Sequence, residues 1–344
     1  MDFDIALILL QDGLVNGAIY ALLALSLVMV FTVTRVIFIP QGELVAFAAL
    51  TYAALNAGQV PGSIWLLAAL GAGAFLMGAW GQRYTFGAAG LGALALETLV
   101  LPAVMIVLVQ AVAPARPGVV VSALLTIAIV APMAPYLYRM AFQPLAEAPV
   151  LILLVAAVGV HLALVGTGLL AFGPEGFRGT PLATTPLVLG TQTVPGQALA
   201  IGALTGTLML AQALFFGRTL TGKALRAVAV NRLGASLVGI GPVRSGRIAF
   251  TLAGGIGALS GVLIAPLTTV YYDSGFLVGL KGFVAAIIGG LLSYPIAVAA
   301  ALMVGCVESF SSFYASAFKE VIVFTTIIPV LLWRSLRHPA EDEE

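Results

Sequence analysis

The sequence predicts an all-α fold, a polytopic helical membrane protein with about nine or ten transmembrane segments. Of its 344 residues, 61% are hydrophobic and only 8% are charged, whereas soluble domains carry about 25% charged residues. The mean hydropathy is +1.12. We expect residues 1–344 to form one transmembrane domain, because the spans use up the chain and leave no stretch for a separate aqueous domain. These values exclude a soluble enzyme, a disordered chain and a nucleic-acid-binding protein.

The net charge and the small numbers of cysteines and histidines exclude several classes of partner and ligand. The net charge is only +1, from 15 basic and 14 acidic residues, so no overall field attracts a polyanion and we expect no nucleic-acid partner. The single Cys306 excludes an internal disulfide, and with only two histidines we expect no metal site. Met1–Asp4 lacks the basic region of a signal peptide, so the first apolar run is expected to be retained as a span.

Charged residues delimit the apolar runs, so the predicted spans can be taken in order. Residues 44–82 hold two spans, because the turn-forming residues 56–62 interrupt them. Before the most basic segment, the spans are predicted at 13–34, 44–82 (two), 86–113, 118–138, 150–172 and 197–216. A polar loop is predicted at 173–196. After the basic segment we predict a span at 248–269, a broken or re-entrant segment at 282–307 and a last span from about Ala315 to Trp333, with Lys319 and Glu320 at its outer end.

Three pairs of glycines spaced four residues apart predict close helix packing. They are Gly13 with Gly17, Gly202 with Gly206, and Gly257 with Gly261.

Lysines and arginines predict the orientation. Segment 217–247 holds six basic residues and no acidic one, so we place it in the cytoplasm. Counting back through seven spans puts the N-terminus outside and brings Arg35, Arg83 and Arg139 inside. If 282–307 is a hairpin with both ends outside, Arg334 and Arg337 also lie inside.

The same basic segment, 217–247, is predicted to contain a short amphipathic helix. Apolar residues recur at helical spacing from Leu225 to Ile240, and Gly241–Pro242 should end the helix. Such a helix either docks into a groove on a soluble partner or lies on anionic lipid headgroups. Composition alone leaves both interpretations open.

A phosphate-binding motif is nearly present at Gly217–Ala224 but lacks an essential group. Ala224 replaces the Ser or Thr that would bind Mg²⁺, and the segment follows a membrane helix rather than a strand. We therefore expect this chain to bind no cofactor, and any ATP–Mg to be bound by partner chains.

Two interrupted segments predict the translocation path, because broken helices in both halves of a transporter mark its binding site. One is Pro40–Glu43, and the other runs from Lys281 to Pro295. The alternative is that both are ordinary helix ends. The candidate path residues are Asn16, Gln41, Gly42, Glu43, Lys281, Phe283, Gly289 and Gly290.

Two ionisable residues lie within predicted spans, Glu97 and His161. Such residues are functional candidates, and a proton-coupled carrier would use them. Alternatively, each is a neutral group bonded to a neighbouring helix. The sequence contains no catalytic constellation, so we predict a transport protein rather than an enzyme.

Three stretches together follow one family pattern: residues 13–22, residues 221–240, and residues 279–291 followed by Pro295 and Glu308–Ser309. In that order they resemble the first span, the cytoplasmic coupling loop and the C-terminal signature of the branched-chain amino acid ABC importer permeases. Segments 142–145 and 172–175 fit as well, so the resemblance covers most of the chain outside 85–121.

The resemblance implies a membrane subunit of an ATP-driven uptake system in the bacterial inner membrane. Implied partners are two cytoplasmic ABC ATPases, a second similar permease in a heterodimer, an external or periplasmic solute-binding protein and membrane lipid. The substrate class is branched-chain or related amino acids, with small amides and aromatic acids as further possibilities. The residues expected to couple to the ATPases are Thr221, Gly222, Arg226, Ala227, Ala229, Asn231, Leu233, Ala235, Leu237, Gly239 and Ile240.

The sequence departs from the family pattern in three places. The usual Asn-Phe-Ala-His-Gly-Glu reads Phe38 to Glu43 here and keeps only Gly42 and Glu43. The general coupling motif of ABC importers is only loosely matched at 228–234. Segment 86–113 is an extra span relative to a typical member. The alternative function is a self-sufficient secondary carrier or channel for small polar or amphiphilic solutes.

Overall fold

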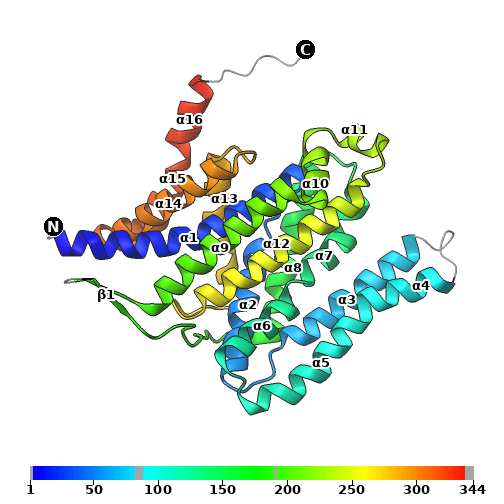
Figure 1. The fold of residues 1–344 in the computed structure, drawn as a ribbon, viewed down its shortest axis with the longest axis horizontal. Coiled ribbons are helices and arrows are strands. Elements are labelled where there is room, and N and C mark those ends of the chain that lie inside the picture. The colour runs from blue at the N-terminus through cyan, green and yellow to red at the C-terminus, as the bar shows by residue number, and fades with distance from the viewer. Residues whose placement is uncertain (1–2, 82–87, 190–191, 338–344) are drawn as a thin grey trace.

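The computed structural model describes residues 3–81, 88–189 and 192–337, and helices make up most of them (Figure 1). Eight helices among these residues are long and apolar enough to cross a membrane, which confirms a polytopic helical membrane protein. Arg83 and the predicted start of a span at Phe86 lie outside the described residues. The polar loop 173–196 contains a short antiparallel pair of strands, β1 (Leu187–Leu189) and β2 (Gln192–Val194).

The elements follow one another with short connections. In the first half they are α1 (Phe3–Thr34), α2 (Gln41–Asn56), α3 (Ser63–Gly81), α4 (Ala88–Ala95), the π-helical turn η1 (Leu96–Val100), α5 (Leu101–Val112), η2 (Ala113–Ala115), α6 (Val119–Val130), α7 (Met133–Leu137), the π-helical turn η3 (Tyr138–Phe142), η4 (Gln143–Leu145) and α8 (Val150–Phe172). In the second half they are β1 (Leu187–Leu189), β2 (Gln192–Val194), α9 (Gly196–Arg218), α10 (Leu220–Val230), α11 (Arg232–Leu237), α12 (Pro242–Ile264), α13 (Ser274–Ile288), α14 (Tyr294–Tyr314), η5 (Ser316–Phe318), α15 (Lys319–Thr325) and α16 (Ile327–Arg337).

Loops gather at two ends of the bundle. Arg35, residues 143–150 and residues 232–243 line one pocket, so these segments share an end. At the opposite end the Tyr52 hydroxyl donates to the Thr180 carbonyl at 2.9 Å, and Phe177 pairs with Val270. Because basic residues gather at the first end, we call it the cytoplasmic end. Arg35 and the coupling segment lie together there, as the orientation argument requires.

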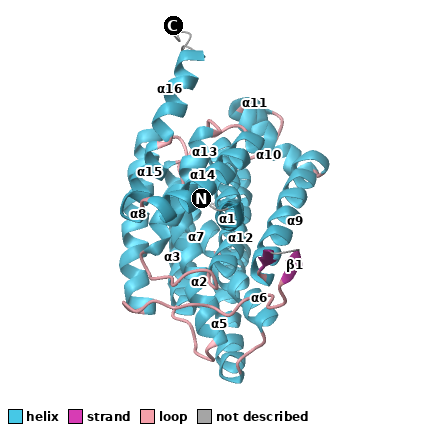
Figure 2. Ribbon diagram, turned by 90° about the vertical axis from the view of Figure 1, so that its left-hand side faces the viewer, coloured by secondary structure: helices cyan, strands magenta, loops and turns pink. Residues whose placement is uncertain are grey.

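Five helices form the centre of the bundle: α1, α2, α12, α13 and α14. Helix α2 is buried along nearly its whole length, whereas α8 and α9 expose most of their surface on the flanks (Figure 2). Gly17 lets α14 approach α1 closely: an added Cβ would lie 2.8 Å from the Leu302 Cα. Of the three predicted glycine pairs, those on α1 and α12 face neighbouring helices, whereas Gly202 and Gly206 face nothing within 4 Å.

Helices α2 and α13 are too short to span the bilayer. They contain 16 and 15 residues, or about 24 and 22 Å at 1.5 Å per residue, against a hydrocarbon core of about 30 Å. Their N-terminal turns meet, because Gly42 lies against the backbone of Gly275 and Gly279. From that crossing α2 runs to the outer end, and α13 runs toward the cytoplasmic end, where the following Tyr294 shares a pocket with Arg226.

Segment 282–307 is broken, as predicted, and forms a helical hairpin, but the break does not lie at Pro295. The break lies at 289–293, where Gly290 and Leu291 adopt positive φ of 69° and 56°. Pro295 does not interrupt a helix but occupies the first turn of α14, where its missing N–H costs nothing.

The expected last span is not one continuous helix. It is divided into η5, α15 and α16, and α16 projects away from the bundle (Figure 1). Pro329 explains the break before α16, because it cannot donate a hydrogen bond to the carbonyl of Thr325.

The basic segment also differs from the prediction. Helix α12 already begins at Pro242, so Arg244 and Arg247 lie on the span and not in the loop. The expected single amphipathic helix is two helices, because Asn231 has extended backbone angles and caps α11 by accepting from the Gly234 N–H at 2.8 Å.

Substituting Gly17 tests the packing of α1 on α14. We expect Gly17→Ala to destabilise the protein by about 1–3 kcal/mol, because the new methyl group overlaps the α14 backbone. Gly202→Ala is the matched control, since its Cβ would meet nothing within 4 Å. Thermal unfolding of the purified protein measures both, and equal unfolding temperatures for the two variants would contradict the packing.

Candidate functional site

The crossing of α2 and α13 positions three of the predicted path residues. The Gln41 amide donates to the Ala253 carbonyl at 2.9 Å, which ties the start of α2 to the middle of α12. Gly42 fills the contact with α13, and Glu43 is completely buried. Gln41 Oε1 and Glu43 Oε2 are buried and have no hydrogen-bond partner within the described residues. The crossing therefore carries unused hydrogen-bond acceptors inside the protein.

His161 is the partner of Glu43. It is the middle residue of α8, and its Nδ1 lies 2.8 Å from Glu43 Oε1. The imidazole ring also packs on Phe276 of α13, with ring centroids 4.8 Å apart. On its other side His161 lines a pocket of about 360 Å³ whose remaining walls are apolar. Phe283, a predicted path residue, lines the same pocket.

Lys281 is the centre of a second cluster, in which Lys281 and Glu308 are buried while Lys319 and Glu320 are partly exposed. Its Nζ donates to Glu308 Oε1 at 2.5 Å and to Glu320 Oε1 at 3.2 Å. The Tyr20 hydroxyl donates to Glu308 Oε2 at 2.5 Å, and Lys319 Nζ lies 3.8 Å from Glu308 Oε1. Two basic and two acidic side chains thus balance one another, which is the condition for keeping charge in an apolar interior.

A polar pocket of about 530 Å³ opens above this cluster. Asn16 of α1 and Glu308 of α14 line it together with Asp12 and Lys319. Asn16 and Lys281 therefore belong to neighbouring parts of one polar region on the outer half of the bundle.

Gly289 and Gly290 lie apart from the other path residues. They form the turn between α13 and α14, next to a pocket of about 700 Å³ lined by Phe216, Arg226 and Tyr294. The predicted path residues therefore fall at three places: the helix crossing, the outer polar region and the cytoplasmic turn.

Glu97 is paired with two arginines. Its Oε1 accepts from Arg247 at 2.7 Å and its Oε2 from Arg139 at 3.0 Å. Glu97 and Arg139 both lie on π-helical turns, η1 and η3. The pairing connects the extra helix α4–α5 to α12 near the cytoplasmic end. Glu97 is therefore not an isolated charge within a span.

The coupling segment is anchored by one face and exposed on the other. Leu225, Val228 and Ala235 are buried and pack with Val33 and Ala249 at the cytoplasmic end. Exposed apolar side chains, 74–86% accessible, are Leu220, Val230, Leu233, Leu237 and Val238. Of the other predicted coupling residues, Gly222 is buried; Ala227, Ala229 and Ile240 are partly buried; and Thr221, Arg226, Asn231 and Gly239 are exposed.

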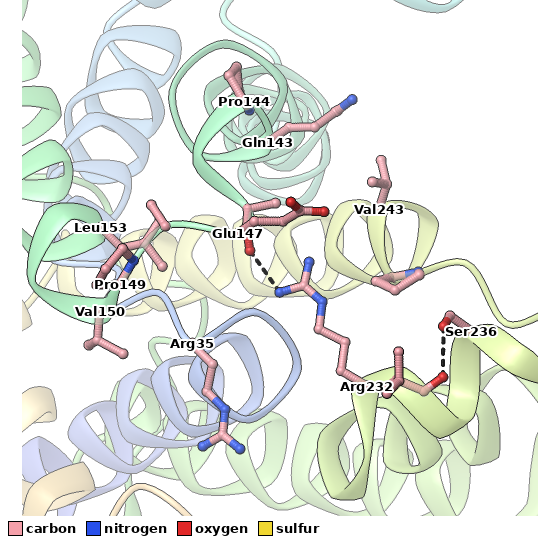
Figure 3. A pocket seen from close by; sticks show the side chains of 14 residues that line it. Arg35, Gln143, Pro144, Glu147, Pro149, Val150, Leu153, Arg232, Ser236 and Val243 are labelled. Atoms are coloured by element: carbon pink, nitrogen blue, oxygen red, sulfur yellow. Dashed lines mark hydrogen bonds between the residues drawn. The ribbon is translucent and has the colours of Figure 1, made fainter.

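A pocket of about 880 Å³ lies beside this segment (Figure 3). Arg232 reaches across it and donates to the Ala146 carbonyl at 2.8 Å, which links α11 to the connection before α8. Arg35 and Glu147 also line the pocket. The coupling segment is therefore held by this hydrogen bond and by the packing of its buried face against Val33 and Ala249.

The sequence predicted His161 and Glu43 as separate candidates and did not predict a role for Tyr20. Intramembrane ionisable groups pair with one another, so a buried Glu and a mid-span His were candidates for a pair. Which acid pairs with which base depends on helix neighbours, and α8 and α2 are distant in sequence. The Lys281 cluster was missed for the same reason.

Removing Lys281 tests the balanced cluster. We expect Lys281→Met to destabilise the protein by about 3 kcal/mol, because Glu308 loses its closest cation in a buried site. Adding Glu308→Gln should restore more than half of the loss, as a double-mutant cycle of thermal unfolding will measure. Lys223→Met, on the exposed face of α10, is the control. If the destabilisation of the double variant equals the sum of the two single-variant effects, the pairing of Lys281 with Glu308 is refuted.

Sequence comparison assigns the chain to a family of known proteins. Residues 81–331 match the family described as branched-chain amino acid transport system / permease component. The high-affinity branched-chain amino acid transport system permease protein LivH of Escherichia coli K12 is 31% identical over 201 residues, which cover 56% of this chain and 65% of LivH. The corresponding protein BraD of Pseudomonas aeruginosa is 29% identical over 203 residues, covering 57% and 66%.

The chain thus matches about two thirds of the length of these curated relatives. No solved structure matches it. The matched family is one of transport components rather than of enzymes, in agreement with the resemblance identified from the sequence. The family match covers well over half of the chain and includes the coupling segment, α12, α13 and α14. The chain belongs to the family of branched-chain amino acid transport system permease components.

Proposed function

We propose that this protein is the membrane permease subunit of an ATP-driven importer in a bacterial inner membrane. It translocates branched-chain or related amino acids by alternating access, and ATP is hydrolysed by two cytoplasmic ABC ATPases that bind to it. A second, homologous permease completes the membrane unit as a heterodimer. An external solute-binding protein delivers the substrate at the outer end.

The observation that carries this proposal is the coupling segment. An apolar side chain that is more than 70% exposed to cytoplasm is unfavourable, and five of them occur within α10, α11 and the turn that follows α11. Binding in a groove of a soluble partner removes that surface from water. Basic residues in the same segment, among them Arg226, favour a partner with an acidic rim.

Helix α12 connects the coupling segment to the helix crossing, which supports coupling of the ATPases to the membrane helices. Helix α12 starts at Pro242 directly after α11, and its Ala253 carbonyl holds Gln41 at the start of α2. A force applied to the coupling segment therefore acts on the crossing through one rigid helix. Movement of α12 would change the contact between α2 and α13, where the backbones of Gly42 and Gly275 touch.

The outer polar region suits an amino-acid substrate. Asp12 and Glu308 offer carboxylates there, Lys319 offers an ammonium group, and Asn16 can donate and accept hydrogen bonds. Groups of both signs match a zwitterion, which presents both an ammonium and a carboxylate group. Deeper in the protein, at the helix crossing, the apolar pocket lined by Phe283 suits an apolar side chain.

Charge reversal in the coupling segment tests the proposal. We expect the protein carrying Arg226→Glu and Leu233→Glu to lose capture of the ATPases encoded beside its gene, because both changes place negative charge on the exposed docking face. Pull-down of the solubilised proteins measures this. Leu187→Glu, exposed at the outer end of the bundle, is the matched control and should capture the ATPases as wild type does.

The alternative function, a self-sufficient carrier, predicts the opposite result, which is transport without an ATPase. Flux of leucine into liposomes that contain only this chain, with no ATPase captured by the wild type, would overturn the proposal.

A further inference from the structure

The pocket beside His161 has one polar group in an otherwise apolar wall. Leu27, Phe38, Leu162, Phe276 and Phe283 are among the residues that line its 360 Å³. His161 Nδ1 is occupied by Glu43, which leaves Nε2 as the remaining polar atom of a ring that lines this pocket. No hydrogen bond to Nε2 occurs within the described part of the chain, and the atom is not among the fully buried ones.

The need to keep the buried Glu43–His161 pair neutral determines whether Nε2 carries a hydrogen. Glu43 is completely inaccessible, and its second oxygen has no partner in the described residues, so a net negative charge on the pair is strongly disfavoured. Three neutral arrangements are possible. In one, an ionised Glu43 pairs with a doubly protonated ring, and in another a protonated Glu43 donates to Nδ1 of a neutral ring. The third, with the proton on Glu43 Oε2 and Nδ1–H donating to Oε1, is disfavoured because the buried Oε2–H would have no acceptor among the described residues. Nε2 carries a hydrogen in the two favoured arrangements, so the pocket is presented with a donor.

The surroundings of Nε2 favour an anionic acceptor. Phe276 stacks on the imidazole with 4.8 Å between centroids, a contact that stabilises a positively charged ring. Phe276 also lies in the first turn of α13, whose N-terminal end carries positive partial charge. The pocket is at the lower end of the size range for small-ligand sites. Its walls exclude water from a bound apolar group.

We propose that His161 Nε2–H, held in place by Glu43, binds the carboxylate of an amino acid in transit while the apolar side chain of that amino acid occupies the pocket. This inference rests on the proposed function and adds to it the residue that recognises the substrate inside the membrane. His161 is the middle residue of α8, and the pocket borders the crossing of α2 and α13. The site is therefore placed where the path must change its accessibility from one side to the other.

The experiment uses the complete transporter in proteoliposomes, with both permeases, both ATPases and an excess of leucine-loaded binding protein. The measured quantity is the ratio of leucine molecules delivered to ATP molecules hydrolysed. The double variant His161→Leu with Glu43→Gln removes the donor and the buried charge together, so the site stays neutral. We expect this ratio to fall at least about tenfold, the contribution of one hydrogen bond to a charged group.

Two comparison variants separate recognition from packing. Glu43→Gln alone retains the imidazole ring, and an amide that donates to Nδ1 leaves the hydrogen on Nε2, so the ratio should fall much less than in the double variant. Leu151→Ala, exposed on the same helix, should match wild type. Equal ratios in the double variant and the wild type would overturn the inference. A wild-type complex that delivers no leucine would instead overturn the proposed function.

A labelling measurement locates the substrate independently of transport rate. The native Cys306 is first replaced by serine, and Leu162→Cys then places a single thiol at the pocket. During turnover with leucine-loaded binding protein, we expect alkylation by a membrane-permeant maleimide to slow at least about twofold relative to turnover with ATP and empty binding protein. An unchanged rate would place the substrate outside this pocket.

Discussion

The close approach of two short helices inside the bundle is the constraint on which the other features depend. Helices α2 and α13 cannot each cross a bilayer, so their N-terminal turns must be buried against protein rather than lipid. Glycine at 42, 275 and 279 allows the two backbones to touch, and Gln41 fixes the start of α2 to α12. Any larger residue at Gly42 would separate the half-helices and open their unpaired backbone groups to hydrocarbon.

Charge pairing is the second condition that the membrane imposes, and it is met by bringing distant segments together. Lys281, Glu308 and Glu320 come from α13, α14 and α15, with Tyr20 of α1 completing the cluster. Glu97 meets Arg139 and Arg247 in the same way near the cytoplasmic end. Each cluster joins helices that could otherwise slide past one another. The clusters therefore define rigid groups, and α12 belongs both to the coupling end and to the crossing.

The exposed apolar side chains divide into two classes with different meanings. Those on α8 and α9 lie on helices that are long and apolar enough to cross a membrane, and their exposure is ordinary for a membrane protein. Those on α10 and α11 belong to a segment with basic residues and capped helices at the cytoplasmic end, where exposure to water is costly. The break at Asn231 separates the two short helices, so Leu225 and Val228 can be buried while Leu233 and Leu237 point outward.

Hydropathy and charge were enough to predict the helical membrane class, the positions of most spans and a basic segment at one end, because a bilayer requires long apolar runs whatever their neighbours are. Predicted boundaries at 150–172 match α8, and the division at 56–62 is observed. The two interrupted segments also identified Glu43 and Lys281 as candidates. Their partners could not be predicted, since His161 and Glu308 become neighbours only through helix packing. The sequence by itself thus determined which groups lie within the membrane, and the tertiary structure decided which of them are paired, because burial of a charge is tolerated only beside its partner.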